Sequence, residues 1–247
     1  MTNSQTLHNL PGSSQFPTTR WTLVAAASDP QRKDARSALV SLCENYWYPL
    51  YVYLRRRGYP PDQAQDLTQE FFIRVLEGRY LDRADPEKGR FRSFMLTSLK
   101  FFAADEQDRQ RAHKRGGGMV VPIEFSSGEE RYQREPGHDE TPECIFERRW
   151  ALSVLERVLQ KLRDEFVHHG RPEHFERLKG FLLGQSEAPY AALAREMNSS
   201  EGALKVAIHR LRKRYRELFR QEIADTVADP AEVEPELRYL AAVLTRK

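Results

Sequence analysis

The chain has 247 residues, of which 40% are hydrophobic and 30% are charged, and its formal net charge is only +3. This length allows one large domain or two small ones, with small hydrophobic cores. No apolar run approaches the roughly 18 residues needed to span a bilayer, which argues against membrane insertion. Cys43 and Cys144 lack metal-ligand spacing, so we expect reduced thiols in a cytoplasmic protein that needs no cofactor.

The small net charge hides a separation of sign along the chain. Residues 109–115 and 205–216 are strongly basic, whereas residues 124–147 are mostly acidic. Local basic clusters matter more than the total charge for binding a polyanion. The two basic segments are therefore the first candidates for nucleic-acid contacts.

The first third of the chain predicts a disordered start followed by helices. Residues 1–18 are polar and contain Pro11 and Gly12, so we expect disorder there. A short helix over 20–27 and a long helix over 32–57 follow, the second interrupted by Pro49 and ended by Gly58.

Two more helices complete the first predicted domain. One is opened by Pro60-Pro61-Asp62 and runs to about residue 77, and the other covers residues 90–115 after a loop at 79–89. Four cations crowd into the last seven residues of the second helix. Helix capping needs fewer, so this end favours phosphate binding.

The middle of the chain reads as a linker between two helical regions. Residues 116–140 combine Gly, Ser, Pro and acidic residues with little helical periodicity, although a short extended piece at 119–125 is expected to pair or dock. Thr141 and Pro142 then form an N-cap and first turn for a helix that continues to about residue 168. Another helix is predicted over 174–183.

The stretch 189–221 has the pattern of a helix-turn-helix. A helix over 190–197 is followed by Asn198, which tolerates the left-handed conformation a sharp turn requires, and by two serines that can cap the next helix. In that second helix one stripe is apolar and the opposite arc is cationic, which is typical of a recognition helix in the major groove. The apolar stripe consists of Leu204, Ile208, Leu211 and Tyr215.

A last amphipathic helix is predicted over 231–244, after Asp229 and Pro230. An isolated helix this short is marginal in water. We expect it to pack on the preceding helices around Trp150 or Phe219. The alternative is that it docks on the first domain, or on a partner, and shields DNA-binding surfaces.

These elements predict an all-α protein of two small helical domains, 19–115 and 141–228, joined by the flexible linker 116–140 and followed by a tail, 229–247. Three blocks then suggest a family. They are DLTQEFFIR from Asp66, FRSFMLTSLK from Phe91 with the basic segment after it, and 189–218. In this order they resemble the extracytoplasmic-function (ECF) group of bacterial sigma-70 factors, with a region-two-like and a region-four-like domain.

The resemblance implies a dissociable specificity subunit, not an enzyme, that binds core RNA polymerase at its β′ clamp and β flap and directs initiation at promoter DNA. An anti-sigma factor is a partner that the sequence neither predicts nor excludes. The polymerase-binding residues implied are Asp66, Gln69, Glu70 and Ile73. The residues implied for the −10 element are Arg92, Phe94, Lys100, Arg109, Arg111, Lys114 and Arg115.

For the −35 element, the resemblance places Lys205, Val206, His209 and Arg210 at base edges. Arg212, Lys213 and Arg214 are expected to hold phosphates, which position a protein without reading sequence. Ser200 and Ala203 complete this set.

Three other classes of protein compete with this interpretation. The first is a helix-turn-helix regulator that never joins polymerase. It would account for the pattern at 189–221 but would leave 66–72 as a plain amphipathic helix. A metal-dependent nuclease would use Asp66, Glu70, Asp105 and Glu106, which lack a defining spacing. A sigma-like chain that only sequesters a partner would not need the cationic recognition face.

Overall fold

The computed structural model describes residues 35–77, 80, 84–85, 89–112, 128–135, 140–182, 190–227 and 229–246. Within these residues all regular structure is helical and no strand occurs, which confirms the predicted all-α class. The helices are α2 (Ala35–Arg56), α3 (Pro61–Leu76), α4 (Phe91–Ala112), α5 (Gly128–Gln133), α6 (Pro142–His168), α7 (Pro172–Leu182), α8 (Tyr190–Glu196), α9 (Glu201–Ala224), the 3-10 turn η3 (Pro230–Glu232) and α10 (Val233–Thr245).

Local sequence signals explain where these helices begin and end. Proline occupies the first turn of α3 and of α6, where no backbone N–H donor is needed. The Thr141 side chain accepts a hydrogen bond from the Cys144 N–H at 3.3 Å, as expected of an N-cap. Gly58 and Gly170 follow α2 and α6 with φ of +92° and +68°, a backbone conformation that glycine adopts without steric cost.

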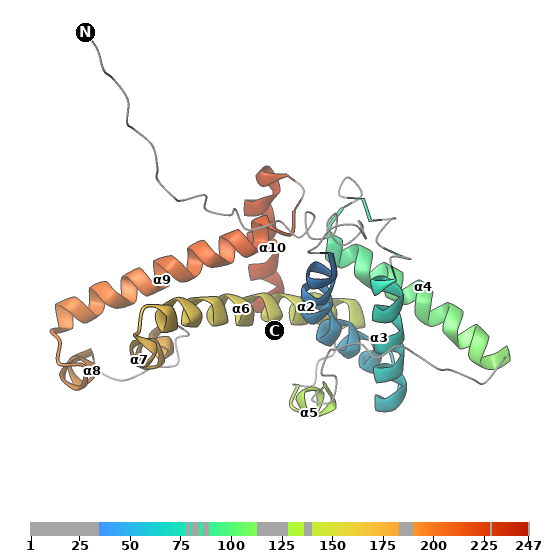
Figure 1. Ribbon diagram of the computed structural model, residues 1–247, viewed down its shortest axis with the longest axis horizontal. Helices are drawn as coiled ribbons and strands as arrows, with labels where there is room; N and C mark the ends of the chain where they lie inside the picture. Colours follow the sequence, from blue (N-terminus) through green and yellow to red (C-terminus); the bar gives the residue numbers. More distant parts are fainter. Residues whose placement is uncertain are drawn as a thin grey trace, which may run out of the picture.

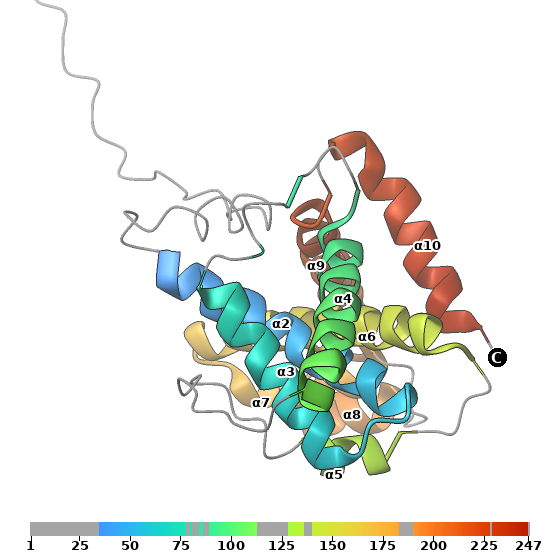
Figure 2. The same ribbon diagram turned by 90° about the vertical axis from the view of Figure 1, so that its right-hand side faces the viewer.

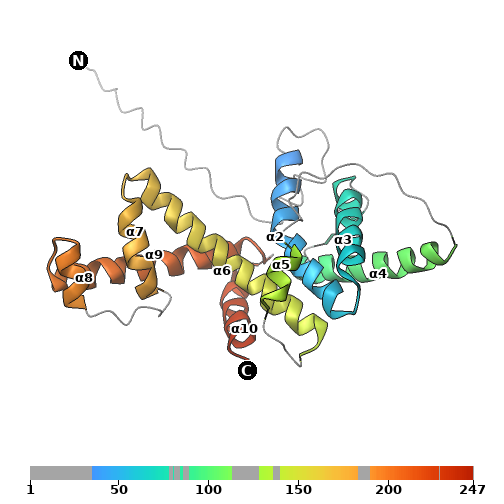
Figure 3. The same ribbon diagram turned by 90° about the horizontal axis from the view of Figure 1, so that it is seen from below.

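Helix α6 runs through the middle of the molecule and contacts both ends of it (Figure 1). Helices α2, α3 and α4 lie around its N-terminal half, and α7 and α8 lie beyond its C-terminal half (Figures 1 and 3). Helix α9 lies alongside α6, and α10 crosses it (Figures 1 and 2). Helix α6 has 27 residues and is therefore about 40 Å long. This one helix connects the group formed by α2, α3 and α4 with the group formed by α7 and α8.

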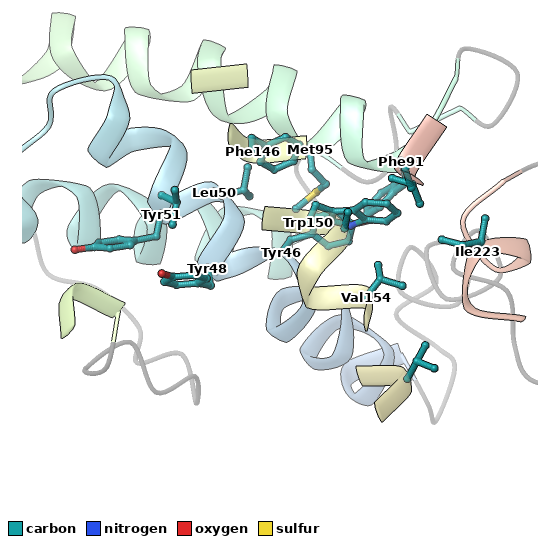
Figure 4. Packing of buried hydrophobic residues seen from close by; sticks show 14 of the residues in the cluster. Tyr46, Tyr48, Leu50, Tyr51, Phe91, Met95, Phe146, Trp150, Val154 and Ile223 are labelled. Carbon is teal, nitrogen blue, oxygen red and sulfur yellow. The ribbon is translucent and has the colours of Figure 1, made fainter. Parts of the chain in front are cut away.

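The core at the N-terminal half of α6 is aromatic (Figure 4). Trp150 of α6 is fully buried and stacks on Tyr46 of α2 with ring centroids 6.5 Å apart. Tyr46 in turn meets Phe91 of α4 edge-on at 5.5 Å. The first helix of the predicted second domain therefore packs within the core of the first.

Part of the predicted linker 116–140 forms a helix docked on α2. The Tyr51 hydroxyl donates a hydrogen bond to Glu129 of α5 at 2.5 Å, and Arg55 Nε donates to the same carboxylate at 2.9 Å. The hydroxyl of Tyr48 donates to Glu135 at 2.7 Å. Two acidic residues of this segment, Glu129 and Glu135, thus pair with tyrosine and arginine side chains of α2, whereas Glu130 is exposed.

Several predicted features lie outside the described residues. They are the polar tract 1–18, the short helix 20–27, the basic residues 113–115, the extended piece 119–125, and the linker residues 116–127 and 136–139.

Candidate nucleic-acid interface

The turn between α8 and α9 has the geometry expected from its sequence. Asn198 has φ of +48°, and it is the one non-glycine residue with positive φ in the described part of the chain. The Ser199 N–H then donates to the Ala194 carbonyl at 2.8 Å, which closes the end of α8. The Ser200 side chain accepts from the Ala203 N–H at 3.1 Å and caps α9. Ser200 and Ala203, both predicted for the −35 set, therefore form the cap of α9.

Helix α9 buries one stripe and exposes the opposite arc. Leu204, Ile208 and Leu211 are buried, as predicted, and Tyr215 is half-buried. The outer arc is mostly cationic; its exceptions include Val206, whose side chain is 49% exposed, and the exposed Glu217 beside Lys213. The exposed residues of this arc are Lys205, Val206, His209, Arg210, Lys213, Arg216 and Arg220.

The predicted base-edge residues lie together on this arc. Lys205 lies over the Tyr190 ring of α8 at 5.8 Å, so its amine stays near the turn. Among the described residues, His209 and Arg210 form no ion pair, whereas Lys213 lies 3.9 Å from Glu217 on its own helix. Lys205, Val206, His209 and Arg210 thus form one accessible surface.

Two of the predicted phosphate-binding arginines have internal partners instead. Arg212 donates to the Phe181 carbonyl at 2.8 Å, which satisfies the C-terminal end of α7. Arg214 reaches Glu165 of α6 with both Nε and Nη2, and the carboxylate holds the arginine pKa above its usual value. These two side chains link α9 to α7 and α6, although Arg212 remains exposed and Arg214 is half-buried. Lys213 is exposed and contacts only its own helix, at Glu217.

Arg92 is not available to DNA in this structure. Its side chain, predicted for the −10 set, is only 2% exposed and lies between Glu147 of α6 and Glu236 of α10. Burial opposes the charge of Arg92, but the two carboxylates outweigh that cost and raise its pKa further. Arg92 is inaccessible because α6 and α10 cover the first turn of α4. The periodicity of the sequence could not show this contact.

The remaining −10 candidates are distributed along α4. Phe94 is half-buried and stacks on Phe91 with centroids 5.8 Å apart. Lys100 is exposed but pairs with Glu143 of α6 at 2.7 Å, and this contact lowers the glutamate pKa. Arg109 and Arg111 lie on the last turns of α4, whereas Lys114 and Arg115 lie outside the described residues.

One residue of this helix was missed by the sequence interpretation. Phe101, next to Lys100, is 69% exposed, the most exposed large hydrophobic side chain in the described part of the chain. The signal was available, because the apolar stripe of α4 contains Phe91, Met95, Leu99 and Phe102, and Phe101 falls beside it. An aromatic ring off the core stripe is a candidate binding group.

The predicted polymerase-binding residues lie on α3. Asp66 is exposed, Gln69 and Glu70 are half-buried, and Ile73 is buried. Arg74 lies between Glu70 and Glu106, at 3.1 and 3.4 Å. The guanidinium of Arg74 thus lies between Glu70 and Glu106, two of the carboxylates that a metal-dependent nuclease would use. Within the described residues, no cluster of side chains suited to a metal ion occurs.

The two predicted DNA-contacting surfaces lie at opposite ends of the molecule. Helix α4 is at one end, and α8 with the first half of α9 is at the other (Figure 1). Within the described residues, no helix combines the length and apolar character that crossing a membrane requires.

Comparison with known proteins gives one match. Residues 44–113, which cover α3, α4 and most of α2, match the family model of sigma-70 region 2. No curated protein and no solved structure matches the chain. This partial match supports membership of the sigma-70 family and suggests a sigma-factor role.

Proposed function

We propose that this protein is a sigma factor of the ECF group, which joins core RNA polymerase in the cytoplasm and directs initiation by reading −35 and −10 elements. The observation that carries the proposal is the exposed cationic arc of α9 in a chain whose residues 44–113 match sigma-70 region 2. A region-2 domain supplies the polymerase-facing half, and the α8–α9 unit supplies a helix-turn-helix of the region-four kind.

On this proposal the exposed end of α9 enters the major groove of the −35 element. Its first three turns present Lys205, Val206, His209 and Arg210 to base edges, while Lys213 holds a phosphate. Arg212 and Arg214 fix the angle at which α9 leaves α6 and α7. They act by positioning the recognition helix.

The −10 element is assigned to α4. Strand opening requires unstacked bases to be captured, and an aromatic face provides about 1–3 kcal/mol per stacked base. Phe101 has the exposure for this role. Its neighbour Lys100 pairs with Glu143 and would have to exchange that carboxylate for a phosphate in order to bind DNA. Phe94 is already stacked on Phe91 and is the weaker candidate.

Core polymerase is assigned to the outer face of α3, where Asp66 is exposed and Glu70 lies one turn further along. Charge complementarity at such a face sets partner choice and association rate more than affinity. The β′ clamp is the expected partner there, and the β flap is the expected partner of the α7–α9 end.

The test is run-off transcription with purified core polymerase on a library of genomic fragments. We expect discrete transcripts with the wild-type protein and none with Asp66→Lys. The control Glu44→Lys, which makes the same charge change at an exposed position of α2 outside the assigned surfaces, should retain them. If the protein binds DNA but neither binds core polymerase nor yields transcripts, it is a regulator that acts without polymerase.

A further inference from the structure

The C-terminal helix α10 covers the beginning of α4 through one buried carboxylate. Glu236 is fully buried, and Arg92 Nη1 donates a hydrogen bond to one of its oxygens. The other oxygen pairs with Arg90 Nε at 2.7 Å. A single side chain of α10 thus engages two arginines that precede it by about 145 residues.

The surroundings of the two arginines complete a closed cluster. Arg92 also donates to Glu147 of α6 at 2.6 Å and lies over the Trp150 ring at 4.6 Å. The Tyr239 ring of α10 lies 5.1 Å from the Arg90 guanidinium and 5.4 Å from that of Arg92. Even so, Nη2 of Arg92 is buried without a hydrogen-bond partner among the described residues.

A cluster of this kind is a costly way to attach a helix. Removing charges from water costs several kcal/mol per ion, and well-packed apolar residues in the same place are often as stabilising or more so. The rest of the α10 contact is made in that simpler way, by the buried side chains of Val233, Leu240 and Val243. Stability alone therefore does not explain why this contact is made by buried charges.

The chemistry of the ligand suggests an explanation. Guanidinium groups bind carboxylate and phosphate oxygens in the same planar, bidentate manner. We propose that Glu236 stands in for a DNA phosphate, so that α10 and promoter DNA compete for Arg90 and Arg92 at the start of α4. This inference rests on the proposed function, which assigns α4 to the −10 element.

Helix α10 is suited to leave this surface. It has only 13 residues, too few for a stable isolated helix, and an exposed turn at residues 229–232 connects it to α9. Its departure would uncover both arginines while Glu147 remains on α6 beside Arg92. The surface would then change from neutral, with two arginines and two glutamates, to net positive.

The test measures binding of a fluorescein-labelled forked duplex to the full-length chain over a range of salt concentrations. We expect Glu236→Gln to bind more tightly than wild type and to steepen the slope of log affinity against log salt by about one for each arginine released. The matched control is Glu232→Gln, which removes the same charge from an exposed position on the same tail. It should leave the slope unchanged.

A double variant tests whether Arg92 is the group that contacts DNA when Glu236 no longer pairs with it. Arg92→Gln combined with Glu236→Gln should lose about one unit of the added slope. If the double variant binds as Glu236→Gln does, or if Glu236→Gln binds as Glu232→Gln does, the proposal is overturned. Hydrogen exchange of the wild-type chain adds a variant-free measurement, since DNA should speed exchange of α10 amides, and unchanged exchange would contradict competition.

The outcome is separable from that of the proposed function. Duplex binding is read without polymerase, so a tail that competes with DNA would be detected even if run-off transcription failed. Conversely, transcripts from the wild-type protein together with an unchanged Glu236→Gln slope would refute the competition alone.

Discussion

Asn198 determines how sharply α9 departs from α8. It holds φ of +48°, a conformation that costs most L-residues about 1–2 kcal/mol and costs glycine nothing. We expect Asn198→Val to lower the free energy of unfolding by about 1–2 kcal/mol, and Asn198→Gly to stay within about 0.5 kcal/mol of wild type. Urea titration measures both, and a valine variant as stable as the glycine variant would contradict the role of the turn.

Arg210 and Lys213 differ in what each should contribute to DNA binding. Arg210 lies with His209 on the exposed arc, and Lys213 lies one turn further along α9. Arg210→Ala should weaken binding to a matched −35 site by about 1–3 kcal/mol and relax one base position, because a bidentate arginine–base contact is lost. Lys213→Ala should weaken matched and scrambled sites alike. Equal losses on both sites for both variants would overturn the assignment.

The sequence pattern predicted the exposed residues of α9 but not the partners of Arg92 and Arg214. Lys205, Val206, His209 and Arg210 are found on the accessible arc because a helix fixes which residues share a face. Arg92 and Arg214 have equally cationic neighbours in the sequence, yet their side chains pair with Glu236 and Glu165. A partner that is distant in sequence leaves no local signal.

At the scale of elements, α5 is held to α2 by ionised groups. Burial alone would raise the Glu129 pKa, but hydrogen bonds from Tyr51 and Arg55 outweigh it and hold the pKa below its usual 4.5. A carboxylate with a depressed pKa stabilises the fold fully above that usual value, and this contribution is lost as the pH falls below it.

We therefore expect the free energy of unfolding to fall as the pH drops below about 4.5, partly through release of α5. Glu129→Gln removes the titrating group, so this variant should be less stable at pH 7 and lose less on acidification. Glu130→Gln, an exposed neighbour on α5, should behave as wild type. Urea titrations at several pH values measure this, and an acid loss that is the same in all three proteins would exclude α5 from the effect.

Several helix starts were predictable, but two of the packing arrangements were not. Helix α7 begins at Pro172, two residues before its predicted start, and α10 begins at Val233 after a 3-10 turn. Proline, serine, threonine and glycine signals act within a few residues, so α3, α6 and α9 begin where the sequence indicates. Residues 128–135 were read as linker because α5 has only six residues, too few for a periodic pattern. In α10 the apolar stripe was clear, but the buried Glu236 resembles any exposed glutamate until Arg92 is placed beside it.

For the whole molecule, the shared helix α6 decides how the two predicted domains are coupled. Its N-terminal half contributes Trp150 to the core with Tyr46, and its C-terminal half packs with α7 and α9. The domain boundaries remain a prediction, since they were drawn from composition. The continuity of α6 nevertheless means that loosening one half should weaken the support of the other.

This coupling can be measured with reporters in one half and a variant in the other. The chain has three tryptophans, so Trp21 is first replaced by Phe. Trp47 and Trp150 then report on α2 and the first half of α6, whereas far-UV circular dichroism reports on all helices. Leu211→Ala, at a buried position of α9, should cost about 2–5 kcal/mol. If the molecule unfolds as one unit, the urea midpoints from tryptophan fluorescence and circular dichroism coincide, and both shift together in the variant. A fluorescence midpoint that stays in place while the circular dichroism curve splits would show two independently unfolding domains.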